Sequence, residues 1–207
     1  MKPVRLYISS PGDVADERQR ALTVVQRLQQ EFSELSIEAV LGEQEPHLVQ
    51  AKAAAAVSSP GDFDIYTTII GGRLGGAWGA PSGEEGLGHP VSITEMEYQQ
   101  AVTSARDRGA PELLVYRQSL AAEQQATAQG RTVAEFFDKW FLSDEDQTAT
   151  GAYHTFAAAE QFEDLFTVHL RKLLRRFLPR PNNLPDPDSS FVGRKGLIRE
   201  VKGYLRQ

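Results

Sequence analysis

The run FDIYTTII at residues 63–70 constrains the fold more than any other stretch of the chain. It is rich in β-branched and aromatic residues and has glycine close by on both sides, which is typical of a strand. The run is apolar enough to be buried on both faces, as strands of a parallel sheet are. A parallel strand must be followed by a crossover, which is usually a helix. The sequence therefore predicts helices on both faces of a sheet.

The rest of the chain alternates strand-like and helix-like segments. The other predicted strands cover residues 3–8, 36–41, 111–116 and 153–157. The first predicted helix is capped by Asp13 and has Ala21, Leu22, Val25, Leu28 and Phe32 at helical spacing. Another, at 131–141, begins with Thr132 and Glu135 as a capping box. The remaining predicted helices cover 48–57, about 94–107 and about 159–177. This alternation predicts an α/β, flavodoxin-like fold with a five-stranded parallel sheet in the order 2-1-3-4-5.

Composition narrows the function classes. The chain has 207 residues, of which 41% are hydrophobic, and a formal net charge of -6. The negative charge argues against nucleic acid or an anionic membrane as a partner. There are no cysteines, the four histidines lack metal-ligand spacing, and no apolar stretch approaches the ~20 residues of a membrane span. We expect a soluble cytoplasmic protein with no metal site.

The pentapeptide SSPGD occurs twice, at residues 9–13 and 58–62. The first copy follows a strand and precedes a helix, so it is predicted at the carboxyl edge of the sheet, where open α/β folds bind ligands. The second copy precedes a strand, so it is predicted at the opposite edge, where its Pro-Gly makes a turn and ends a helix. Only the first copy is expected near a site.

At the first copy, Ser9, Ser10 and the free amides ahead of the helix are placed to meet an anion. A reading without a ligand is equally simple. Asp13 then caps the helix, and Arg18 pairs with an acidic residue.

The glycine-rich stretch at 71–91 is longer than most loops, which suggests a lid or a binding loop. It has no Gly-Lys-Ser/Thr, so it is not a P-loop. Gly71, Gly72 and Arg73 are candidates for contact with a nucleotide phosphate, and Trp78 can stack on a base. The alternative is a surface loop in which Arg73 forms a salt bridge.

The segment SITEMEY (92–98) begins the next helix with two overlapping capping boxes, Ser92 with Glu95 and Thr94 with Glu97. Only one can start the helix, so the other acid is free for another role. A carboxylate at this edge can stabilise positive charge that develops on a sugar. The alternative is that both acids only complement the helix dipole.

Residues 179–190 contain four prolines and no apolar periodicity, which predicts a linker. Residues 191–207 then begin a further helix, as expected for the truncated start of another domain. The folded domain is accordingly predicted to span residues 1–178.

Three motifs in this order resemble a bacterial and eukaryotic domain family of unknown function that is similar to TIR domains. They are YISSPGDVADER, FDIYTTIIGGRLG and SITEMEYQQA, and the family pattern is F-I-S-S-x-x-D-x-x-x-E-R followed by T-E-x-E-Y. Such domains typically precede NACHT, NB-ARC or other signal-transduction ATPases. The segment FVGRKGLI resembles the start of such an ATPase, although Gly196 stands where an acid is usual.

The resemblance implies an N-terminal TIR-like effector of a larger sensor protein, in antiphage defence for example. Some TIR relatives cleave NAD with a helix-borne glutamate, and by position Glu97 is the better match and Glu95 the second. The chain lacks the Trp-Cys pair of the enzymatic TIR pattern. Two expectations follow. One is an NAD glycohydrolase that is activated when the ATPase oligomerises. NAD is then a substrate and not a cofactor. The other is a non-catalytic module that self-associates.

Overall fold

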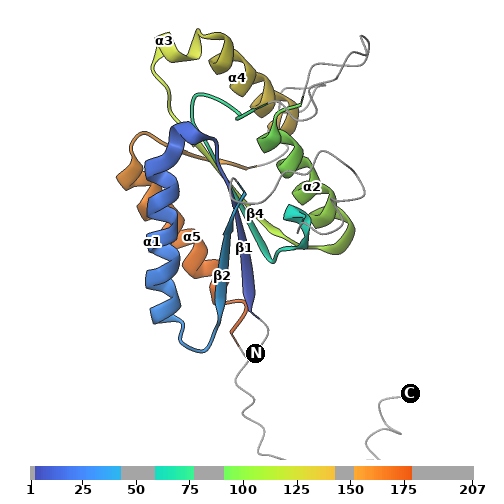
Figure 1. Cartoon of the computed structure of the whole chain (residues 1–207), viewed down its shortest axis with the longest axis vertical. Helices are drawn as coiled ribbons and strands as arrows, with labels where there is room; N and C mark the ends of the chain where they lie inside the picture. Colours follow the sequence, from blue (N-terminus) through green and yellow to red (C-terminus); the bar gives the residue numbers. More distant parts are fainter. Residues whose placement is uncertain (1–2, 43–58, 77–90, 143–151, 179–207) are drawn as a thin grey trace, which may run out of the picture. The chain divides into compact units, whose positions relative to one another are not determined.

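The computed structural model describes residues 3–42, 59–76, 91–142 and 152–178. These residues form a five-stranded parallel sheet with helices on both sides (Figure 1). The strands are β1 (Val4–Ser9), β2 (Ile37–Leu41), β3 (Ile65–Ile70), β4 (Glu112–Gln118) and β5 (His154–Phe156). Their order is β2-β1-β3-β4-β5, which confirms the predicted fold class and strand order.

The centre of the sheet is β3, which pairs with β1 on one side and β4 on the other. All six of its residues are buried, as the unbroken apolar run predicts. Side chains alternate between the two faces of the sheet, so β1 directs Leu6 and Ile8 to one face and Tyr7 and Ser9 to the other.

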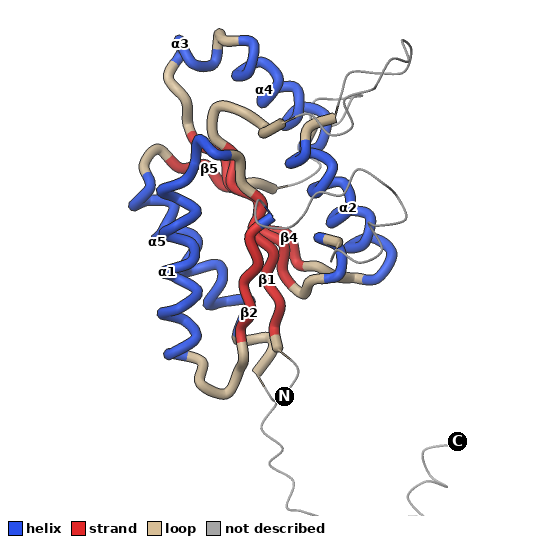
Figure 2. Tube along the Cα trace, in the orientation of Figure 1, coloured by secondary structure: helices blue, strands red, loops and turns tan. Residues whose placement is uncertain are grey.

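Helices α1 (Ala15–Glu31) and α5 (Ala159–Leu174) pack against each other on one face of the sheet (Figure 2). Ion pairs join their outer surfaces, where Arg20 contacts both Glu160 and Glu163. Beneath them the ring of Tyr116 packs against Phe162 and Phe166 of α5.

Helices α2 (Ile93–Arg108) and α4 (Ala128–Phe141) cover the other face. An aromatic cluster fills the space below them, with Tyr7 stacked on Tyr66, and Tyr98 against Phe136 and Phe141. Burial raises the pKa of Tyr98 to about 12, so its hydroxyl stays protonated at neutral pH.

Two predicted helix starts are wrong. Asp13 does not cap α1. The first SSPGD forms a 3-10 turn, η1 (Gly12–Val14), which displaces the α1 start to Ala15, and the Asp13 carboxylate turns to the loop after β3. Helix α4 begins earlier than predicted, because Thr127 accepts a hydrogen bond from Gly130 N and caps it. A short helix that the pattern did not predict, α3 (Ala122–Gln125), precedes it.

Some predictions fall outside the described residues: the helix at 48–57, Trp78 and most of its loop, the linker at 179–190, and the ATPase-like segment. The chain divides into two compact units, Met1–Phe177 and Leu178–Gln207. No helix in the described part of the chain has the length and apolarity to cross a membrane.

The second SSPGD also forms a 3-10 turn, η4 (Pro60–Asp62), with Ser59 and Asp62 as a capping box. Its Gly61 lies directly against α2. A Cβ atom added there would be 2.8 Å from Ser104 Cβ and 3.3 Å from the Gln100 carbonyl oxygen. At Gly12 in the first copy, the atom nearest to an added Cβ is the exposed tip of the Arg73 side chain, at 2.8 Å.

These contacts predict that the same substitution changes the free energy of unfolding by different amounts in the two copies. Gly61→Ala forces α2 away from η4 and should lower the free energy of unfolding by about 1–3 kcal/mol. Gly12→Ala needs only a rotation of Arg73 and should change it by less than about 0.5 kcal/mol. Urea unfolding of both variants provides the measurement. A loss below about 0.5 kcal/mol in Gly61→Ala would show that Gly61 is not closely packed against α2.

Between α5 and the sheet, two histidines lie with ring centroids 4.1 Å apart, His154 on β5 and His169 on α5. The Tyr116 hydroxyl is 2.9 Å from His169 Nδ1. Burial lowers the pKa of His169 below its ordinary value of 6.5, and His154 and Lys172 lower it further. The unfolded chain therefore binds a proton at His169 more readily than the folded domain does.

This lowered pKa predicts that stability rises with pH across the window just below 6.5 and is lost as the pH falls through it. Unfolding by urea at about pH 7.5 and about pH 5.5 measures the change. His169→Gln retains an acceptor for Tyr116 but does not titrate, so it should lose less stability between the two values. The same pH dependence in both proteins would contradict the assignment.

Candidate functional site

The carboxyl ends of β1 and β3 mark the position where the strand order reverses. From β1 the chain crosses to β2 on one side, and it returns to β3 on the other. Loops that leave the two strands in opposite directions open a crevice in folds of this class, and ligands bind there. Residues 9–14 and 71–76 lie at this edge.

The start of α2 settles which of the two predicted capping boxes begins the helix. Ser92 is the N-cap, and its hydroxyl accepts a hydrogen bond from the Glu95 backbone nitrogen at 3.1 Å. Thr94 therefore lies inside the first turn, and Glu97 is not used in capping. Its side chain points toward the sheet and is only 4% exposed.

The Glu97 carboxylate is held by hydroxyls of β1. Tyr7 donates a hydrogen bond to Oε1 at 2.7 Å, and Ser9 donates to Oε2 at 2.6 Å. Gly42, which follows β2, lies against the same group, since a Cβ atom there would be 2.8 Å from Glu97 Oε1 and 2.7 Å from the Tyr7 hydroxyl. The ends of β1 and β2 thus converge with α2 on one buried carboxylate.

Two more hydroxyls are buried on this side of β3. Those of Tyr66 and Thr68 have no hydrogen-bond partner of normal geometry in the described part of the protein. Burial raises the pKa of Tyr66 well above its usual 10, and the negative charge of Glu97 raises it further. The nearby hydroxyls of Ser9 and Thr68 oppose this shift. Tyr66 therefore keeps its proton, and its hydroxyl lies near Ser9, Thr68 and Glu97 without a hydrogen bond of normal geometry.

A second set of contacts joins the loops after β1 and β3. Asp13 accepts a hydrogen bond from the Gly72 nitrogen at 2.7 Å and lies 3.4 Å from Arg73 Nε. Gly71 is packed so closely that an added Cβ would be 2.7 Å from the Asp13 carboxylate. Ser10 accepts a hydrogen bond from Arg18 at 3.2 Å. The predicted salt bridge of Arg73 is therefore present, and Asp13 supplies it.

Glu95 lies in a different environment. Its carboxylate accepts hydrogen bonds from Lys139 Nζ at 2.7 Å and Trp140 Nε1 at 3.3 Å, both on α4. It connects α2 to α4, whereas Glu97 connects α2 to β1. The structure therefore gathers Ser9, Glu97 and the Asp13–Arg73 pair at one edge of the sheet and places Glu95 apart from them.

Three residues of the site were not predicted: Tyr7, Gly42 and Tyr66. Alternation along β1 places Tyr7 on the same face as Ser9, so this strand pattern contained a signal for it. For Tyr66 the signal was weaker, because a tyrosine in a buried strand usually reads as core. No group of three metal-ligating side chains is found in the described ranges.

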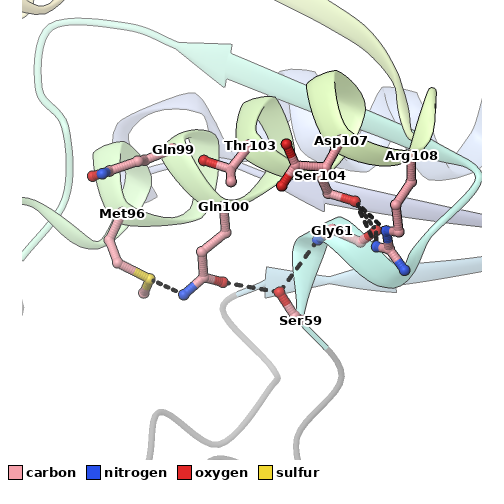
Figure 3. Close-up of a pocket in the computed structure, with 9 residues that line it drawn as sticks. All are labelled: Ser59, Gly61, Met96, Gln99, Gln100, Thr103, Ser104, Asp107 and Arg108. Atoms are coloured by element: carbon pink, nitrogen blue, oxygen red, sulfur yellow. Dashed lines mark hydrogen bonds between the residues drawn. The ribbon is translucent and has the colours of Figure 1, made fainter.

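A surface cavity of about 650 Å³ lies elsewhere, between α2 and η4 (Figure 3). Its polar groups bind one another. Ser104 Oγ is 2.9 Å from the Gly61 carbonyl oxygen and accepts hydrogen bonds from Arg108, and Gln100 contacts the hydroxyl of Ser59 at 3.1 Å. We interpret this cavity as part of the packing interface between η4 and α2.

The chain matches no model of a known protein family, and no curated protein matches it.

The unsatisfied hydroxyl of Tyr66 predicts an unusual response to a conservative change. Tyr66→Phe removes a buried donor without a partner and should raise the free energy of unfolding by about 1 kcal/mol. Tyr116→Phe is the matched control, because it removes the bond to His169 and should lower stability by about 1 kcal/mol. Urea unfolding of both tests this. A similar loss in the two variants would show that Tyr66 is already hydrogen-bonded.

Proposed function

We propose that the domain is a TIR-like effector that hydrolyses a nucleotide, with NAD as the candidate substrate and Glu97 as the catalytic residue. The observation that carries the proposal is the buried Glu97 carboxylate, held by Tyr7 and Ser9 where the strand order reverses. A charged group at this depth is costly unless hydrogen bonds satisfy it, so perturbed or buried acids in clefts are candidates for catalysis.

The reaction that suits this group is cleavage of the bond between the nicotinamide nitrogen and ribose C1′. The bonding electron pair goes to the positively charged nicotinamide nitrogen, which becomes neutral, and positive charge develops on the ribose. Water then adds to C1′ and releases a proton, giving ADP-ribose and nicotinamide. A fixed carboxylate near the ribose stabilises the charge that develops in this transition state.

The orientation of the Glu97 carboxylate is fixed by two hydroxyl donors of one strand. Tyr7 donates to Oε1 and Ser9 donates to Oε2. Because Tyr7 and Ser9 already fix the carboxylate, little reorganisation is needed during reaction, which is the source of electrostatic catalysis.

The Asp13–Arg73 group is proposed to contact the nucleotide beside Glu97. The Arg73 side chain is 45% exposed, and its ion pair with Asp13 is long at 3.4 Å, so it can turn toward the bound nucleotide. Ser10, Gly71 and Gly72 border the same edge. Trp78, a further candidate for base stacking, lies outside the described residues.

Regulation is proposed to follow from assembly. In this scheme a downstream ATPase in the same chain oligomerises and brings effector domains together, and the domains self-associate. The alternative, a purely adaptor role, would be favoured by an exposed apolar patch. Across the described surface the exposed large hydrophobic residues are only Val91 and Val168, which lie before α2 and on α5.

Glu97→Gln tests the proposal. Glutamine can keep one acceptor and one donor for Tyr7 and Ser9, so the fold should lose at most ~1 kcal/mol. The charge is lost, and NAD hydrolysis by the activated full-length protein should fall about 100- to 1,000-fold. Release of nicotinamide, followed by chromatography, is the measurement.

Glu95→Gln is the matched control, because Glu95 is an acid two residues away whose carboxylate binds Lys139 and Trp140 of α4 instead of β1. It should retain full activity and lose at most ~1 kcal/mol of stability. Loss of activity in Glu95→Gln with full activity in Glu97→Gln would reverse the assignment. If the activated protein consumes no NAD or other nucleotide, the enzymatic proposal fails and the adaptor role remains.

A further inference from the structure

A second polar cavity, of about 310 Å³, opens where β4 and β5 end. Its walls are formed by the end of β4, the segment after β4, the first half of α4, and β5. The side chains that matter are two arginines, two amides and two hydroxyls: Arg117, Arg131, Gln118, Gln125, Ser119 and Thr155. None of these residues has a role in the site around Glu97.

The guanidinium of Arg117 lies over two aromatic rings. Its Cζ atom lies 4.4 Å from the ring centroid of Phe137 and 5.9 Å from that of Tyr153. Contacts over an aromatic ring use the flat face of a guanidinium and leave the N–H groups at its edge available. Arg117 forms no ion pair or hydrogen bond with a carboxylate of the described residues.

Arg131 stands on α4 and is fixed at one atom. Its Nη1 donates a hydrogen bond to the Ala126 carbonyl oxygen at 2.7 Å. Its other N–H groups are not bound to any acid that the structure describes. Many other arginines do have such partners: Arg20, Arg27, Arg73, Arg108, Arg171 and Arg176 each lie within ion-pair distance of an Asp or Glu.

The carboxylate of Glu17 is linked to the cavity, because it accepts a long hydrogen bond of 3.4 Å from Gln118 Nε2. Among the described residues no hydrogen bond or ion pair joins Glu17 to Arg117 or Arg131. The cavity thus offers two guanidinium groups, with hydroxyls and amides around them, in a protein of net charge -6. Planar forks of N–H donors match the oxygens of a phosphate.

The cavity adjoins the edge that holds Glu97. A Cβ atom added to Gly71 would be 3.1 Å from Gln118 Oε1, and one added to Gly72 would be 3.9 Å from Leu120 Cδ2. Ser9 is in register with Thr68, and Thr68 with Val115, two residues before Arg117. With strands about 4.8 Å apart and a rise of about 3.3 Å per residue, the Cα atoms of Ser9 and Arg117 are about 12 Å apart on the same face.

We propose that this cavity binds the phosphate groups of the nucleotide whose sugar lies at Glu97, with Arg117 and Arg131 as the ligands of the phosphate oxygens. The identity of the nucleotide as substrate rests on the proposed function, whereas the anion site itself does not. The separation of about 12 Å suits a substrate that carries its phosphates beyond the reacting ribose, as a dinucleotide does.

Isothermal titration calorimetry of the 207-residue chain with inorganic pyrophosphate and with ADP-ribose tests the site. Both should bind, and Arg117→Gln and Arg131→Gln should each weaken binding by at least about tenfold, because each removes charge-assisted hydrogen bonds. Removal of the aromatic contacts of Arg117 could impair folding. Arg131 is exposed, so Arg131→Gln should fold normally and tests the site independently. Arg106→Gln, an exposed arginine on α2, is the control and should bind normally.

The two ligands distinguish the sources of phosphate. A nucleotide is supported as the source of the phosphate if the wild type binds ADP-ribose more tightly than pyrophosphate and both arginine variants lose this binding. Failure of pyrophosphate to bind, or equal binding by the wild type and both variants, overturns the site. Because neither ligand is turned over by glycohydrolysis, these results stand whether or not Glu97 proves catalytic.

Discussion

The buried carboxylate of Glu97 is the constraint on which the architecture of the α2 face depends. A carboxyl group that is 4% exposed requires hydrogen-bond donors, and Tyr7 and Ser9 supply them from one strand. This explains why β1 is apolar toward α1 and polar toward α2. It also explains a glycine at 42, because a side chain there would collide with the Tyr7–Glu97 pair. One bonding arrangement thus fixes the position of α2 relative to β1 and β2.

The two faces of the sheet are stabilised differently. Under α1 and α5, aliphatic and phenylalanine side chains form the core together with Tyr116, and exposed ion pairs such as Arg171–Glu31 join the helix surfaces. Such pairs contribute little individually. Under α2 and α4 the core is built largely of tyrosine and phenylalanine. Tyrosine contributes both apolar area and a hydroxyl, so the aromatic core can continue into a polar edge without a break. Tyr7 and Tyr66 occupy this transition, which places the candidate site at the end of the core.

Sequence patterns predicted the sheet well because the burial of β3 and the helical periods are properties of long segments. The helix starts failed where several caps compete. Asp13 is a good N-cap by type, yet its carboxylate binds the Gly72 nitrogen, a partner 59 residues away that no local rule contains. Glu97 was predicted as one of two alternatives, and the choice depended on Ser92. The signal for Tyr66 was weak and there was none for Gly42, because their roles arise only when separate strands meet α2.

The two copies of SSPGD show how far a local sequence determines structure. In both, the chain forms a 3-10 turn, so the turn itself is a local property of proline, glycine and a nearby acid. The aspartates then differ. Asp62 bonds back to Ser59 of its own turn, whereas Asp13 reaches across the edge to Gly72 and Arg73. The difference follows from position, since a parallel sheet places a neighbouring loop beside the first copy and a helix beside the second. The pentapeptide specifies a turn, and the strand order decides that only one of the two turns borders the candidate site.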